Sequence, residues 1–110
     1  MIIIQIIDNN TVVVETSDEL KKAISEDNNY NYIYLGSDIT AASGFIINSN
    51  KSKVIIDGTY NNKKYTYTNN LSLEEDVIKV STTNKKIVLK NINIVSSHGY
   101  GVIYVPSHPN

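Results

Sequence analysis

Short runs of apolar residues follow one another along the whole chain, separated by Asn, Gly, Ser, Asp and Lys. Runs of this length, rich in Val, Ile and Tyr and bounded by turn residues, are typical of short β-strands. The pattern therefore predicts an all-β protein with these strands: Ile2–Ile7, Thr11–Glu15, Tyr32–Leu35, Phe45–Ile47, Val54–Asp57, Lys64–Thr68, Val77–Val80, Ile87–Lys90, Asn91–Val95 and Val102–Val105.

One segment near the start has helical spacing instead. Residues 16–19 read TSDE, which fits a capping box with Thr16 at the N-cap. Leu20, Ala23 and Ile24 follow at i, i+3 and i+4, so they form one apolar stripe. This pattern predicts an amphipathic helix over Thr16–Glu26. A single helix followed only by strands argues against alternating βαβ units.

The strands repeat in register. Segment 54–58 (VIIDG) superposes on segment 87–91 (IVLKN) 33 residues later, and segment 33–37 (IYLGS) fits the same template. Segments 45–47, 77–80 and 102–105 form a second series. Two interleaved series of this period predict a coiled solenoid in which Ile33, Val54 and Ile87 lie one over another. Segment 61–75 is then the expected insertion.

The solenoid interpretation assigns roles to corners and ends. Gly36 or Ser37, Gly58 and Asn91 are expected at sharp corners, where Gly and Asn adopt a positive φ at low cost. The helix is expected to cover the first turn with its apolar stripe. The last turn, near Val102–Val105, would be left open, and this predicts self-association at that end, as a homodimer.

Four segments in this order resemble the start of pectate-lyase-like right-handed parallel β-helix proteins: TSDELKKAI (16–24), YIYLGSDIT (32–40), KVIIDG (53–58) and IVLKNINI (87–94). The chain is most similar to the adhesin-like bacterial surface members of that group, over about residues 11–105. The resemblance implies a right-handed parallel β-helix of about three turns with an N-terminal capping helix. It also implies one domain, 1–110, with a cap segment (1–30) and turns (31–105), at the start of a longer helix.

The resemblance implies a non-catalytic surface module, extracellular or on the cell surface, that presents a face for a polysaccharide or host glycan. An alternative is the cap of a polysaccharide lyase or hydrolase whose catalytic turns lie outside this chain. A third is a structural spacer. Lyases of the group use calcium and a basic residue, often Arg. All ten basic residues here are Lys, so that Arg has no counterpart.

Composition narrows the function further. Hydrophobic residues make up 41% of the 110 residues, enough for a core, and the net charge is −1. This balance does not favour nucleic-acid binding, which usually needs a cationic surface. The chain contains no Cys, so it has neither a disulfide nor a cysteine zinc site. No apolar run approaches the length of a membrane span, and the first residues do not form an export signal.

Tyrosines are the strongest candidates for ligand contact. Tyr30, Tyr32 and Tyr34 alternate along one predicted strand, so they share a face that points outward if Ile33 and Leu35 point inward. A second aromatic group surrounds the expected insertion. Outward tyrosines can stack on sugar rings, although the N-terminal strands could instead pack across them. The ligand-binding candidates are Tyr30, Tyr32, Tyr34, Tyr60, Tyr65 and Tyr67.

Acidic residues at two places in the chain are candidates for metal binding. Glu74, Glu75 and Asp76 form the densest acidic cluster, and Asp57 precedes a predicted corner at Gly58. Carboxylates are calcium ligands, so Ca²⁺ is the cofactor to consider. The alternative for the cluster is a solvated loop that protects the next strand from aggregation. The alternative for Asp57 is a side chain that accepts hydrogen bonds from nearby backbone N–H groups.

Overall fold

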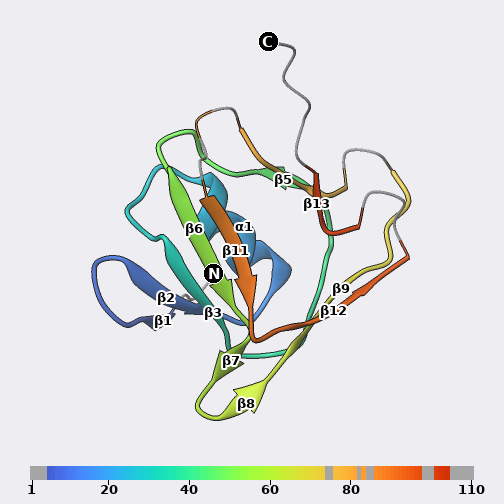
Figure 1. Ribbon diagram of the computed structural model, residues 1–110, viewed down its shortest axis with the longest axis horizontal. Helices are drawn as coiled ribbons and strands as arrows, with labels where there is room; N and C mark the ends of the chain where they lie inside the picture. Colours follow the sequence, from blue (N-terminus) through green and yellow to red (C-terminus); the bar gives the residue numbers. More distant parts are fainter. Residues whose placement is uncertain (1–4, 74–75, 82, 84–85, 98–100, 105–110) are drawn as a thin grey trace.

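The computed structural model describes residues 5–73, 76–81, 83, 86–97 and 101–104 (Figure 1). The described part is mostly β-structure with one short helix, as predicted. The elements are β1 (Gln5–Ile6), β2 (Thr11–Val14), α1 (Ser17–Ser25), β3 (Tyr32–Leu35), β4 (Ile39–Thr40), β5 (Phe45–Ile46), β6 (Lys53–Asp57), β7 (Thr59–Tyr60), β8 (Lys63–Lys64), β9 (Thr66–Asn69), β10 (Ile78–Lys79), β11 (Lys86–Lys90), β12 (Asn93–Ser96) and β13 (Ile103–Tyr104).

Three parallel sheets organise the chain. The first holds β2, β3, β6 and β11 in parallel, with β1 added antiparallel to β2. The second holds β4, β9 and β12, and the third holds β5, β10 and β13. From β3 onward, each pass of the chain adds one strand to each sheet in the same order. Figure 1 shows the result: β11 lies over β6, and β12 over β9.

The predicted register is correct between β6 and β11 but wrong between β3 and β6. Val54 pairs with Ile87 and Ile56 with Leu89, as the repeat predicts. Ile33, however, pairs with Ile56 and not with Val54. A shift of two residues leaves every side chain on the same face of a strand, so Ile33 still points into the core, where it is fully buried.

The expected insertion at 61–75 is also corrected. Strand β9 lies within that range, yet Tyr67 pairs with Ile39 on one side and Ile94 on the other. The excursion from the sheets is instead the β7–β8 hairpin, which projects from one corner (Figure 1). Its two-residue turn has Asn61 at φ 52° and Asn62 at φ 65°. Such left-handed pairs match the twist of a hairpin, and Asn tolerates them well.

Asn and Gly occupy the corners for two different physical reasons. Asn91 has φ 51°, as predicted. Gly58 and Gly36 do not have a positive φ, which corrects the expectation for them. Glycine is required at these two positions because a larger residue would clash with a neighbour: a Cβ on Gly58 would lie 2.4 Å from the Cβ of Ile92. A Cβ on Gly36 would lie 2.7 Å from Cγ1 of Val13.

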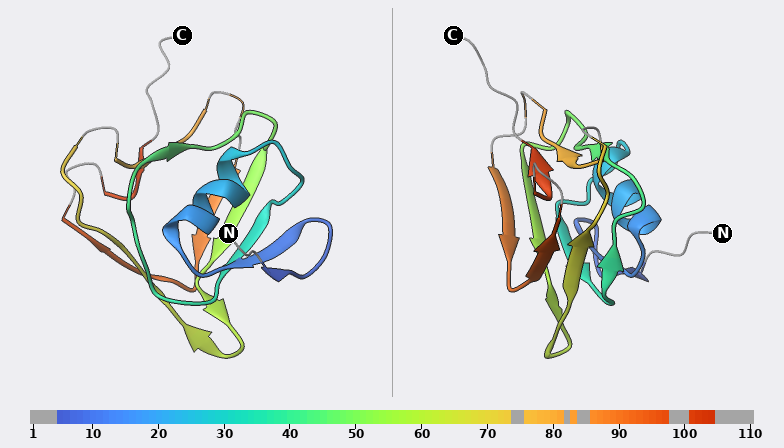
Figure 2. Two further views of the ribbon diagram at one scale, coloured as in Figure 1. Left: turned by 180° about the vertical axis from the view of Figure 1, so that it is seen from behind. Right: turned by 90° about the vertical axis from the view of Figure 1, so that its right-hand side faces the viewer.

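Helix α1 forms where its sequence predicts it. Thr16 is the N-cap, and its Oγ1 accepts a hydrogen bond from the backbone N–H of Glu19 at 3.1 Å. The three stripe residues, Leu20, Ala23 and Ile24, are at most 1% exposed. They pack into the core beside β2 and β5, and Figure 2 shows the helix lying across one end of the three sheets. Burying side chains of the size of Leu20 and Ile24 stabilises the fold by about 1.5–3 kcal/mol each.

Burial declines along the stack away from the helix. In the second sheet, Ile39, Tyr67 and Ile94 occupy one register position on successive strands. Their exposed fractions are 2%, 4% and 41%. Ile94 therefore has the orientation of a core residue, but none of the described strands stacks beyond it. The described strands β11, β12 and β13 are each the last of their sheets at this end.

Candidate functional site

The outward face of β3 carries a cluster of three tyrosines. Tyr32 and Tyr34 alternate with the fully buried Ile33 and Leu35, so their rings lie on the outer side of the first sheet. Their ring centroids are 4.9 Å apart with planes tilted by 46°. Tyr60, on the hairpin strand β7, extends the group: its ring centroid lies 5.3 Å from that of Tyr34. We call Tyr32, Tyr34 and Tyr60 the tyrosine cluster.

Asp57 fixes one end of the tyrosine cluster. Its Oδ2 accepts a hydrogen bond from the hydroxyl of Tyr32 at 2.7 Å, and its Oδ1 accepts one from the backbone N–H of Thr59 at 3.0 Å. The Asp57 side chain is buried. Burial of Tyr32, reinforced by its bond to this carboxylate, raises the pKa of the Tyr32 hydroxyl well above its usual range. Tyr32 is therefore held in one orientation and stays protonated.

Lys90 approaches the same cluster from β11. Its Nζ lies 5.8 Å from the centroid of the Tyr32 ring, which is within the range of a cation–π contact. The tyrosine cluster and its two charged neighbours, Asp57 and Lys90, thus come from β3, β7, β6 and β11. Because parallel pairing sets the register between β3, β6 and β11, the rings of Tyr32 and Tyr34 are positioned by backbone hydrogen bonds rather than by flexible loops.

A polar hollow of about 670 Å³ adjoins the tyrosine cluster. Tyr34 and Tyr60 form its aromatic wall. The polar groups around it include the side chains of Asp8, Asn61, Asn62 and Asn91. Amides offer both donors and acceptors, and carboxylates offer acceptors. This combination of flat apolar rings and hydrogen-bonding groups suits a ligand with both apolar ring faces and hydroxyl groups.

The other predicted tyrosines lie elsewhere. Tyr30 and Tyr65 are half-buried and pack against the core, and Lys63 lies 5.6 Å from the Tyr65 ring. Tyr67, a ligand-binding candidate in the aromatic group around the expected insertion, is instead a core residue, 4% exposed. Burial raises its pKa to about 12. The structure thus brings together Tyr32, Tyr34 and Tyr60 of the predicted set, and not the other three.

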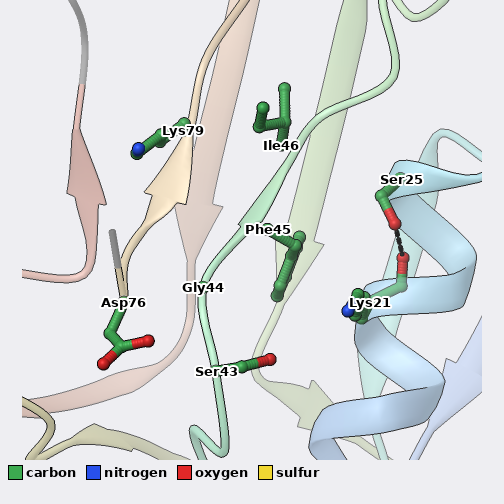
Figure 3. Close-up of a pocket in the computed structure, with 8 residues that line it drawn as sticks. All are labelled: Lys21, Ser25, Ser43, Gly44, Phe45, Ile46, Asp76 and Lys79. Atoms are coloured by element: carbon green, nitrogen blue, oxygen red, sulfur yellow. Dashed lines mark hydrogen bonds between the residues drawn. The ribbon is translucent and has the colours of Figure 1, made fainter. Parts of the chain in front are cut away.

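The two metal candidates that the structure describes, Asp57 and Asp76, lie apart. Glu74 and Glu75 lie outside the described residues. Asp57 borders the hollow beside the tyrosine cluster, whereas Asp76 borders a separate one of about 580 Å³. Figure 3 shows this second hollow, with Lys21 on α1 and Lys79 on β10 on opposite sides of β5. Within the described residues, no three His, Cys, Asp or Glu side chains form a group that could hold a metal ion. Calcium binding stays a prediction.

One buried lysine, just before β6, was not predicted from the sequence. Lys51 is 5% exposed. Its Nζ donates hydrogen bonds to Oδ1 of Asn28 at 2.6 Å, to the carbonyl of Asn28 at 3.2 Å and to the carbonyl of Tyr30. Desolvation by burial lowers the pKa of Lys51 to about 8, although Asp27 partly offsets the shift. A lysine among Asn and Ser residues is typical of an exposed loop, so the burial of Lys51 could not be predicted.

Comparison with known proteins identifies the family. The model of the family described as "putative pectate lyase-like adhesive domain" matches residues 11–110. The chain belongs to this family, which confirms the resemblance in its sequence and points to an adhesin-like role at a surface. Searches of curated proteins and of solved structures gave no match. Among the described residues, no helix has the length and apolar character needed to cross a membrane.

Proposed function

We propose that this chain is a non-catalytic, extracellular or cell-surface adhesive module whose tyrosine cluster and adjoining hollow bind carbohydrate. The observation that supports this most directly is the tyrosine cluster itself: three tilted, partly exposed rings next to a hollow bordered by Asn and Asp side chains. Family membership supports the adhesive role. The choice of carbohydrate rests on the chemistry of the site.

We further propose that the scaffold is the first part of a right-handed parallel β-helix. Three sheets receive their strands in the same order on three successive passes, and the pairing between passes is parallel throughout. Helix α1 buries its apolar stripe at one end, as a cap would. In this architecture the outward residues of stacked strands form a continuous face. Such a face can follow an extended polysaccharide.

The cluster would recognise a sugar through two kinds of contact. The apolar face of a pyranose ring packs on Tyr34 or Tyr60, whose rings are half-exposed. The hydroxyl groups of the sugar exchange hydrogen bonds with Asn61, Asn62 and Asn91. Tyr32 and Asp57 satisfy each other, so they support the rings rather than contact the ligand.

The experiment is a glycan array that includes neutral and acidic polysaccharides, probed with the purified chain. Binding of the unmodified chain is compared with that of the double variant Tyr34→Ala/Tyr60→Ala. Each ring contributes on the order of 1 kcal/mol, so the double variant is expected to bind on the order of thirtyfold more weakly. Unchanged binding by this variant would remove the tyrosine cluster from the proposal.

A matched control separates ring stacking from hydroxyl contacts. Tyr34→Phe/Tyr60→Phe keeps both rings and is expected to retain most of the affinity. Circular dichroism of each variant checks that the fold is intact. Release of unsaturated uronides, followed by ultraviolet absorbance, tests the alternative that the chain is part of a lyase. Turnover in that assay would contradict a purely adhesive role.

A further inference from the structure

The buried amine of Lys51 and the partly buried amide of Asn28 form a pair that the adhesive role does not use. Lys51 lies just before β6, and Asn28 lies in the segment between α1 and β3. The Lys51 Nζ is 2.6 Å from Oδ1 of Asn28. A carbonyl bond is about 1.2 Å long, so the amine nitrogen lies within about 3.8 Å of the amide carbon. Nucleophile and electrophile are thus close to reacting distance in the folded chain.

The Asn28 amide is held and polarised on both sides. Its Oδ1 also accepts a hydrogen bond from the backbone N–H of Tyr30 at 3.0 Å. Its Nδ2 donates to the carbonyl of Lys22 at 3.2 Å, at the end of α1. A fixed N–H donor on the carbonyl oxygen stabilises negative charge that develops there during attack on the carbon. The amide therefore has one orientation, with its oxygen activated.

The amine is also suited to attack. The buried Lys51 has its pKa lowered to about 8 by desolvation, so a fraction of the side chain is neutral, and therefore nucleophilic, near neutral pH. Asp27 is near enough for its charge to act on Lys51. Its Oδ1 accepts a hydrogen bond from Nδ2 of Asn50, the residue before the lysine.

We propose that Lys51 and Asn28 condense to an intramolecular isopeptide bond that links the end of the helical segment to the first strand of the second pass. Neutral Nζ attacks Cγ of Asn28 and forms the new C–N bond. The bond from Cγ to Nδ2 breaks, and one proton passes from Nζ to the departing nitrogen. The products are a secondary amide and ammonia. The reaction needs no oxidant, reductant or cofactor.

The cross-link would join positions 23 residues apart on neighbouring passes of the chain. This geometry suits an adhesive protein, because force applied along the chain would be carried by a covalent bond across the first pass. The proposal does not depend on the tyrosine cluster, which lies on other residues. The two can fail separately.

Mass spectrometry of the purified full chain tests the proposal directly. The linked protein is lighter than its sequence by one ammonia, and proteolysis yields a branched peptide containing Asn28 and Lys51, with no tryptic cleavage after Lys51. An intact mass equal to that of the sequence, with Asn28 and Lys51 recovered in separate peptides, would overturn it. This measurement uses the unmodified chain, so it does not depend on whether a variant folds.

Two variants exclude the competing loss of ammonia by cyclisation of an asparagine with its own backbone. Lys51→Met is expected to restore the full mass, because the nucleophile is gone. Lys53→Met, which removes an exposed lysine two residues away, is expected to keep the lowered mass and the branched peptide. A lowered mass that persists in Lys51→Met would assign the loss to cyclisation and contradict the isopeptide bond.

Discussion

The hydrogen bond between Tyr32 and Asp57 can be tested by removing one hydroxyl group. In Tyr32→Phe, Oδ2 of Asp57 loses its partner at 2.7 Å, while the carboxylate remains only 5% exposed, so water replaces that partner poorly. Hydrogen bonds to charged groups contribute about 1.5–3 kcal/mol, and leaving a buried acceptor unsatisfied costs a similar amount. We therefore expect the free energy of unfolding to fall by about 2 kcal/mol. For a domain of this size, Tm falls by roughly 10 °C.

Urea unfolding followed by circular dichroism measures this change, with Tyr60→Phe as the matched control. Tyr60→Phe removes a hydroxyl from the same cluster and is expected to shift stability by less than about 0.5 kcal/mol. A double-mutant cycle with Asp57→Asn then isolates the energy of the pair. If Tyr32→Phe is as stable as the control, the bond does not stabilise the fold, and our account of how the cluster is held is refuted.

Three further predictions follow from other parts of the fold. Gly58→Ala places a Cβ 2.5 Å from the Cα of Ile92, so urea unfolding should show a loss of about 1–3 kcal/mol. A neutral effect would contradict the close approach of the corner after β6 to the corner before β12. The pKa of Tyr67, about 12, and that of Tyr32 are raised by burial above their unfolded value near 10. Their contribution to stability is therefore complete below about pH 10 and is lost as the pH rises through the folded-state pKa values. Urea unfolding midpoints measured over a series of pH values will detect this loss. Midpoints that do not change with pH would contradict the burial of these two hydroxyl groups. If the chain self-associates through its last described pass, light scattering should show a dimer at high concentration, and Ile94→Lys should remain monomeric. An unmodified chain that is monomeric at every concentration would rule out self-association.

The repeat in the sequence predicted much of the strand pairing because core positions and strand period coincide. Val54 and Ile87 pair as expected, and the series that contains Phe45 and Ile78 does form one sheet. The register of Ile33 was missed because a two-residue shift places another apolar residue on the same face. An alternating pattern contains no information that separates these two alignments.

The site was predictable in part. Alternation along β3 was enough to place Tyr32 and Tyr34 on the outer face. Tyr67 was misassigned because its strand, TYTN, has no aliphatic residue and follows two lysines, so it resembled a surface insertion. The bonds from Tyr32 to Asp57 and from Lys51 to Asn28 join residues more than 20 positions apart. No local pattern encodes such contacts, because they arise only when successive passes stack.

The β7–β8 hairpin leaves the first sheet after Asp57 and returns to the second at Thr66. Its two lysines, Lys63 and Lys64, and its turn residues are exposed, so its length and composition are uncoupled from the core. One wall of the polar hollow, Tyr60 with Asn61 and Asn62, is built from this excursion. Ligand preference can therefore diversify by changes within a few hairpin positions, without any compensating change in the stacked strands. The same excursion is the natural place to graft a foreign recognition loop onto this scaffold.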